Sequence, residues 1–123
     1  MIILQIKFLF ITDGTKIDTT PQDKILTISS KASIVYNCCI KNGICYLQLR
    51  NIDISASIEI NEAIISNLPI PKMWFRTLAF AYGVDAQQYL LNLNSNGTLT
   101  VANAWGNMPS GGYYCPPISY QIL

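Results

Sequence analysis

Alternating apolar and polar residues are the main pattern in this chain, and they are clearest between residues 33 and 51. Such alternation predicts half-buried strands. Asn42-Gly43 at its centre predicts a two-residue hairpin turn, because that turn requires a positive φ at both of its central residues. This turn pairs Lys41 with Ile44 and sorts the side chains onto two faces. The inner pairs would be Ile40 with Cys45, Cys38 with Leu47 and Tyr36 with Leu49, and the outer pairs Cys39 with Tyr46, Asn37 with Gln48 and Val35 with Arg50.

A second hairpin is predicted between residues 87 and 103. A two-residue turn at Asn96-Gly97 would mix apolar and polar residues on each face. A three-residue loop, Ser95-Asn96-Gly97, instead pairs Leu93 with Leu99 and Leu91 with Val101. We therefore expect a type I turn followed by Gly97 in the left-handed region, where the substitution Gly97→Val would be costly.

The rest of the chain reads as further short strands and turns. Strands are predicted at 51–60, 73–82 and 118–122, and helical periodicity is absent apart from one candidate turn at 61–66. Pro69 and Pro71 cannot belong to a central strand, because proline lacks the amide hydrogen that the ladder needs. Residues 13–14 and 19–23 are expected to be loops. This pattern indicates an all-β sandwich or barrel.

The first eleven residues are apolar on both faces, which fits either a central strand or a strand buried against a partner subunit. They do not resemble a secretory signal, because a basic n-region and a small-residue cleavage site are both missing; a signal would have implied disulfides. We expect one domain over 1–123. Within it, residues 1–30 form an N-terminal strand and loop for attachment or subunit contact, and residues 31–123 form the main body.

Charge is sparse in this sequence, which has 12% charged residues, 8 Lys+Arg against 7 Asp+Glu, and no His. A net charge of +1 lacks the basic footprint that nucleic-acid binding requires. No apolar run is long enough to insert into a membrane as a spanning helix. Because ordinary domains carry about 25% charged residues, the sequence favours an oligomer that hides uncharged surface over a monomer with an amide-rich surface.

Reactive chemistry finds little support in the sequence. Cys38, Cys39, Cys45 and Cys115 have no C-x-x-C spacing, so we interpret them as free thiols and not as metal ligands. Without His, neither Ser nor Cys has its usual general base. Glu59 and Glu62 come nearest to a paired-carboxylate site, but neighbours of this kind are usually solvated. We therefore expect no enzyme activity, no metal and no cofactor.

Aromatic residues are better candidates for a ligand-binding site. Trp105, Tyr113 and Tyr114 flank a segment of small residues that reads as a loop, and flat aromatic faces beside such residues suit stacking on sugars or contact with protein. The alternative is that these side chains close the end of the sandwich or a subunit junction. Trp74 alternates with other apolar residues, and we interpret it as a core or interface residue.

Four segments, taken in chain order, resemble the C-terminal head domains of bacteriophage tail-fibre, baseplate and head-fibre proteins. They are residues 44–49 after the first hairpin turn, 67–71 with Leu-Pro-Ile-Pro, 91–101 with the second hairpin, and 118–120 with a terminal Tyr. The resemblance covers residues 33–123, and Asn67 stands where the family usually has Gly. It implies an antiparallel jelly-roll-like β-sandwich, similar to tumour-necrosis-factor-like heads, that assembles as a homotrimer and contacts the bacterial surface.

The resemblance and the residue pattern together predict a phage or prophage structural protein. We expect it to be made in the bacterial cytoplasm and to be located in the virion. Its trimeric head would bind a cell-surface receptor, expected to be carbohydrate. The candidate ligand-binding residues are Trp105, Tyr113 and Tyr114 first, and Asn94 and Asn96 at the second hairpin tip. The alternative is a capsid-decorating or baseplate-assembly protein with only protein partners. Neither alternative involves nucleic acid or membrane insertion.

Overall fold

The computed structural model describes residues 21–83 and 87–123. Within them the chain is all-β, with no helix. The predictions of an N-terminal strand at residues 1–11 and of a loop at 13–14 fall outside the described residues. The strands are β1 (Gln22–Asp23), β2 (Ala32–Lys41), β3 (Ile44–Ile54), β4 (Ala63–Ile65), β5 (Phe75–Ala81), β6 (Gln88–Leu93), β7 (Leu99–Val101), β8 (Gly111–Tyr114) and β9 (Ile118–Gln121).

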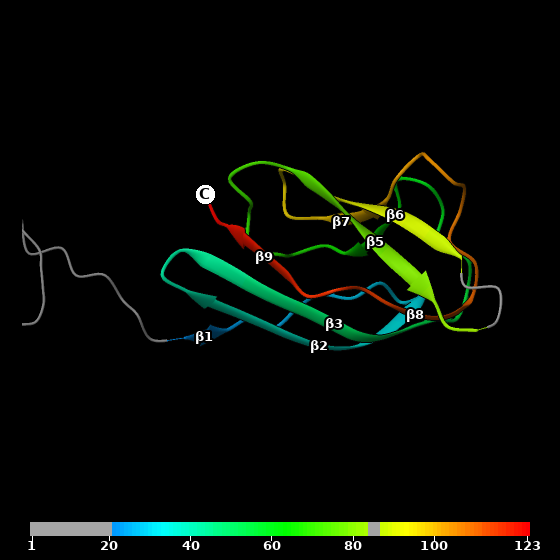
Figure 1. Cartoon of the computed structure of the whole chain (residues 1–123), viewed down its shortest axis with the longest axis horizontal. Coiled ribbons are helices and arrows are strands. Elements are labelled where there is room, and N and C mark those ends of the chain that lie inside the picture. Colours follow the sequence, from blue (N-terminus) through cyan, green and yellow to red (C-terminus); the bar gives the residue numbers. More distant parts are fainter. Residues whose placement is uncertain (1–20, 84–86) are drawn as a thin grey trace, which may run out of the picture.

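These strands form one antiparallel sheet that curls over on itself. Its order is β1-β2-β3-β8-β5-β6-β7-β4, and β9 pairs with β3 beside β8. Figure 1 shows β1, β2 and β3 as one wall, with β5, β6 and β7 facing them as the other, so that the sheet makes a half-barrel with the geometry of a sandwich. The two walls enclose an apolar core, to which both hairpins contribute. Its largest fully buried side chains are Leu47, Leu49, Ile52, Ile58, Ile64, Ile65, Leu91, Leu93, Leu99, Met108, Val101 and Cys45.

The first hairpin has the predicted register from its turn as far as Tyr36, which pairs with Leu49. Asn42 and Gly43 have φ values of 53° and 74°, as the two-residue turn requires. Beyond Tyr36 the prediction was wrong, because a β-bulge shifts the register and Val35 pairs with Asn51 instead of Arg50. Without this bulge the alternation along β3 would turn two polar residues inward. With it, Ile52 and Ile54 face the core.

The second hairpin confirms the predicted register of Leu91 with Val101 and Leu93 with Leu99. The Gly97 amide donates to the Asn94 carbonyl at 2.9 Å, which closes the turn, and Gly97 has a φ of 82°. A β-carbon on Gly97 would overlap the carbonyl oxygen of Leu68. Glycine is therefore needed here for two reasons, its conformation and the close approach of another segment.

That other segment contains the two prolines. Residues 68–71 stay outside the ladder apart from an isolated bridge between Pro71 and Ile122. The Leu68 amide donates to the Gly97 carbonyl at 2.9 Å, and the Tyr120 hydroxyl donates to the Pro69 carbonyl at 2.8 Å. The proline segment thus joins the second hairpin turn to the C-terminal strand β9.

Short strands account for most of the differences from the sequence prediction. Residues 22–23 form β1 instead of a loop, and residues 63–65 form β4 where a helical turn was the candidate. Residues 111–114 form β8 instead of a loop, whereas the strand predicted at 51–60 ends at Ile54 as part of β3. The strands predicted at 73–82 and 118–122 are present as β5 and β9. The missed strands are held by partners far away in sequence, so local patterns carry little signal for them.

A pair of glycine substitutions separates the two requirements at Gly97. An L-residue in the left-handed region costs about 1–2 kcal/mol, and Gly97→Ala adds the overlap with the Leu68 backbone, for a total of about 3 kcal/mol. Gly43→Ala is the matched control, because Gly43 also has a positive φ but nothing lies within 4 Å of a β-carbon there. It should cost about 1 kcal/mol. Urea unfolding measures both, and equal losses would contradict the close approach.

Candidate functional site

An open groove of about 720 Å³ lies on the outer face of the β5–β6–β7 wall. The register of this wall builds its floor, because Arg76 on β5 pairs with Asn92 on β6, and Asn92 pairs with Thr100 on β7. Side chains at these three positions therefore form one row across the sheet. The complete lining is Asn61, Trp74, Arg76, Asn92, Asn94, Ser95, Asn96, Thr98 and Thr100.

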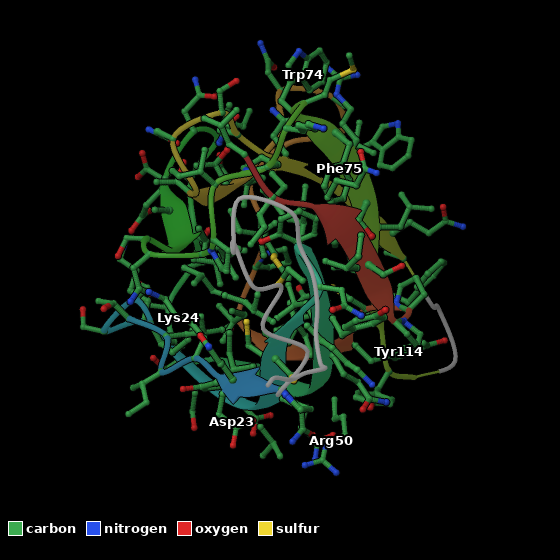
Figure 2. The ribbon with its side chains drawn as sticks, turned by 90° about the vertical axis from the view of Figure 1, so that its left-hand side faces the viewer. Asp23, Lys24, Arg50, Trp74, Phe75 and Tyr114 are labelled. Carbon is green, nitrogen blue, oxygen red and sulfur yellow. The ribbon has the colours of Figure 1, made fainter. Side chains whose placement is uncertain are left out.

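Trp74 and Arg76 form one side of the groove. Because alternate residues of a strand share a face, both point outward while Phe75 between them packs inward against Tyr120, with ring centroids 5.4 Å apart. Figure 2 shows Trp74 standing at the surface of the molecule. Its side chain is 52% exposed, and the guanidinium carbon of Arg76 lies 5.5 Å from its ring centroid. Arg76 Nε also donates to Asn92 Oδ1 at 3.0 Å, which fixes the guanidinium beside the indole.

The second hairpin turn forms the opposite side of the groove. Asn94 Nδ2 donates to Thr100 Oγ1 at 2.9 Å and to the Thr98 carbonyl at 3.2 Å. Asn96 instead uses its amide oxygen as an acceptor. Its Oδ1 accepts from the Thr98 amide at 3.2 Å and from the Thr98 hydroxyl at 2.7 Å. The two amides are therefore held in fixed orientations by the turn.

The chemistry of the groove is polar and nearly uncharged. Arg76 is the one charged residue in its lining, and the other side chains there are amides, hydroxyls and one indole. Amides and hydroxyls both donate and accept hydrogen bonds, so they suit a ligand with many hydroxyl groups. The indole adds a flat apolar surface beside them.

The predicted ligand-binding residues do not form one site. Asn94 and Asn96 line the groove, but Trp105 lies at the other end of β6, where it lines a shallow depression with Gln87, Gln88 and Tyr89. A six-residue strand spans about 20 Å, so one small ligand cannot contact both groups. Trp105 is nevertheless 57% exposed and remains available as a surface residue.

The structure corrects the placement of Tyr113. Because neighbouring residues of strand β8 face opposite ways, Tyr113 points into the core while Tyr114 points outward. Tyr113 is only 2% exposed, its hydroxyl donates to the Pro109 carbonyl at 2.7 Å, and burial raises its pKa to about 12. It is therefore a core residue and not a surface one.

Tyr114 belongs to an aromatic cluster on the outer face. It is 40% exposed and lies 5.5 Å from Phe80 and 5.1 Å from Tyr82, measured between ring centroids. Figure 2 shows Tyr114 at the side of the molecule, away from Trp74 at the top. Tyr114 is thus exposed but outside the groove.

Sequence reasoning missed the two residues that define the groove. Trp74 was interpreted as a core or interface residue, but its half-exposed side chain excludes the core. The signal was present in the alternation of Trp74, Phe75 and Arg76, since one inward-facing Phe between two outward-facing residues is the pattern of a half-buried strand. The missing information was the pairing of β5 with β6, which brings Arg76 against Asn92.

The remaining reactive groups have structural partners. Glu62 accepts a hydrogen bond from the Glu59 amide at 3.0 Å and pairs with Lys31 at 3.0 Å, and these contacts lower its pKa. No set of three or more metal-ligating side chains gathers in residues 21–83 and 87–123. All four cysteines are free thiols. The described part of the chain also contains no helix long and apolar enough to cross a membrane.

Comparison with known proteins identifies a solved structure with the same fold. No family model and no curated protein matches the chain. Among solved structures, the head domain of phage bIL170, described among the receptor-binding domains of lactococcal phages, matches with a TM-score of 0.59 and 17% sequence identity. The match covers 85% of this chain and all of that domain. The chain therefore has the fold of a phage receptor-binding head domain.

Two isosteric substitutions test how the turn holds its amides. Asn94→Asp replaces a donating amide with a carboxylate that faces the Thr98 carbonyl, and we expect a loss of about 1–2 kcal/mol. Asn96→Asp keeps the accepting oxygen that Asn96 uses, so its unfolding free energy should stay within about 0.5 kcal/mol of wild type. Urea unfolding of the two variants checks this, and a larger loss at Asn96 would contradict the assigned orientations.

Proposed function

We propose that this protein is the receptor-binding head of a phage structural protein and that it binds carbohydrate on the bacterial surface without catalysis or cofactor. The observation that carries the proposal is the groove itself, where a half-exposed indole lies beside a fixed guanidinium and faces a row of amides and hydroxyls. The fold shared with a lactococcal phage head domain supports the same assignment.

Each part of the groove has a counterpart in a sugar. The apolar C–H face of a sugar ring stacks on the Trp74 indole, and its hydroxyl groups pair with Asn92 and Asn96. Arg76 supplies fixed donors, because its planar guanidinium is held by the indole and by Asn92. Such a site is open and small, so one copy alone would bind weakly.

Avidity would offset that weakness if the protein assembles as a homotrimer, as tumour-necrosis-factor-like heads do. Three linked sites gain affinity through effective concentration when the receptor repeats along a polymer. The outer face of the β5–β6 wall supports self-assembly, because Leu78 pairs there with Leu90 next to Phe80 and Tyr82. An outward face of a half-buried sheet is ordinarily polar, so this one suits contact with a second copy.

The same apolar face is the observation that favours the alternative function. A capsid-decorating or baseplate-assembly protein would use Leu78 and Leu90 to contact a different virion protein. Such a protein would not need the Trp74 groove. The two functions therefore differ in whether the isolated protein binds cells.

Substituting the indole tests carbohydrate binding. We expect fluorescently labelled wild-type protein to stain cells of a susceptible bacterium, and periodate oxidation of their surface sugars to abolish the staining. Trp74→Ala removes the stacking surface and should weaken binding about tenfold or more, because about 1.4 kcal/mol corresponds to a factor of ten.

The control for this experiment is Trp105→Ala, which removes an equally exposed indole at the other end of β6. It should bind like wild type. Loss of binding in Trp105→Ala alone would move the site to that end of the molecule. Periodate-resistant staining would exclude carbohydrate as the receptor, and a protein that stains no cells of a panel would favour the assembly function.

Introducing a charge on the apolar face tests the trimer. Light scattering during size-exclusion chromatography should give about 41 kDa for wild type, three times the 13.7 kDa of the chain. Leu78→Asp should reduce this mass to that of the monomer, because a carboxylate would be buried unpaired at the contact. Val35→Asp, on the exposed outer face of β2, is the control and should leave the trimer intact. A wild-type monomer would exclude the proposed assembly.

A further inference from the structure

Two of the four cysteines meet inside the core. Cys38 on β2 and Cys45 on β3 both face inward and are buried, with their sulfur atoms 3.7 Å apart. They are not direct cross-strand partners, because Cys38 pairs with Leu47 and Cys45 pairs with Ile40. They are diagonal neighbours on the inner face of the hairpin, and the carbohydrate groove does not use them.

The surroundings make the two sulfurs unequal. The hydrogen bond with Cys38 lowers the pKa of Cys45 to about 7, against the opposing effect of burial. The same contact with Cys45 raises the pKa of Cys38, and burial adds to the effect. Of the two thiols, Cys45 therefore loses its proton more readily. A thiolate is the nucleophilic form of cysteine, so Cys45 is the more reactive member.

The other cysteines lack this arrangement. Cys115 is buried, and desolvation raises its pKa to about 12, which keeps it as an unreactive thiol. Cys39 faces the opposite side of β2 from Cys38, because neighbouring strand residues point opposite ways. Cys39 therefore cannot reach the buried pair without disrupting the strand.

A short segment, residues 22–26, lies along the edge of β2 beside Cys38. The Lys24 amide donates to the Cys38 carbonyl at 2.8 Å, and the Leu26 amide donates to the Tyr36 hydroxyl at 2.9 Å. Figure 2 shows Lys24 next to Asp23 at the side of the molecule away from Trp74. Because β1 has only two residues, this edge of the sheet can open locally without loss of the main sheet. A small oxidant could then reach the sulfurs, whereas a bulky one would be hindered.

We propose that Cys38 and Cys45 form a dithiol site that hydrogen peroxide oxidises to an intramolecular disulfide. The Cys45 thiolate attacks one peroxide oxygen, the O–O bond breaks, and the departing hydroxide takes a proton to become water. The Cys38 sulfur, after losing its proton, then attacks the Cys45 sulfenic acid, and a second water leaves. The two thiols lose two electrons and the peroxide is reduced to two waters. The sulfurs must approach from 3.7 Å to about 2.05 Å.

This disulfide would tie β2 to β3 close to the turn. The reduced pair suits a protein made in a reducing cytoplasm, and oxidation would follow in an oxidising environment outside the cell. The product restricts the unfolded chain and so stabilises the folded one. The hairpin would then resist unfolding where no new protein can be made to replace it.

Peptide mapping tests the proposal directly. Lys41 lies between the two cysteines, so trypsin places them on separate peptides, 32–41 and 42–50. The experiment uses the full chain carrying Cys39→Ser, which leaves one cysteine on each peptide. After treatment with an equivalent of hydrogen peroxide and alkylation of remaining thiols, we expect the two peptides to be joined, and dithiothreitol to separate them. Thermal unfolding of the oxidised protein should shift upward by roughly 5 °C.

The double variant Cys38→Ser, Cys39→Ser is the control, and it should give no joined peptides and no shift in Tm. A stable sulfenic or sulfinic acid on Cys45 without a link to Cys38 would overturn the proposal. So would a link to the peptide that contains Cys115, or a disulfide between two chains on a non-reducing gel. Because these readouts involve no carbohydrate, they are independent of the proposed receptor binding.

Discussion

The structure depends on one constraint, the alternation of inward and outward side chains along each strand. In β3 this alternation puts Cys45, Leu47 and Leu49 into the core, and the bulge opposite Val35 restores it for Ile52. The bulge shows that burying apolar side chains outweighs the regularity of the ladder. Each apolar side chain contributes about 1.5–3 kcal/mol when fully buried, which is more than a disturbed hydrogen bond costs. The same alternation on β5 leaves Trp74 and Arg76 outside, so one rule builds both the core and the groove.

The sequence predicts those parts of the fold that are specified locally. Both hairpins could be assigned with their registers near the turn, because Asn42-Gly43 and the loop ending in Gly97 define which residues face each other; the bulge beyond Tyr36 could not. The strands β4 and β8 could not, since β4 pairs with β7 and β8 lies between β3 and β5. A three- or four-residue strand has too little periodicity to be recognised without its partners. The prediction of Tyr113 as a surface residue failed for this reason, because β8 was taken for a loop.

The groove shows the same limit. Asn94 and Asn96 could be selected from their place at a hairpin tip, but Trp74 acquires its role only from the pairing of β5 with β6. Asn67 is a further example. It stands where the head domains that the sequence resembles usually have Gly, yet its backbone is not left-handed here. Its side-chain amide accepts from the Thr27 amide and donates to the Ile25 carbonyl at 3.0 Å. A side chain that connects two distant segments cannot be inferred from its neighbours in sequence.

Contacts between distant segments also fix the geometry of the groove. The Gly97 turn rests on Leu68, the next residue Pro69 receives the Tyr120 hydroxyl, and Tyr120 in turn contacts Cys45 in the first hairpin. The amides at the groove are therefore positioned by a path of packed groups that ends at the first hairpin. A binding site preorganised in this way loses little conformational entropy when a ligand is bound. This rigidity matters most for a shallow polar groove, because each of its contacts is individually weak and must be in place before the ligand arrives.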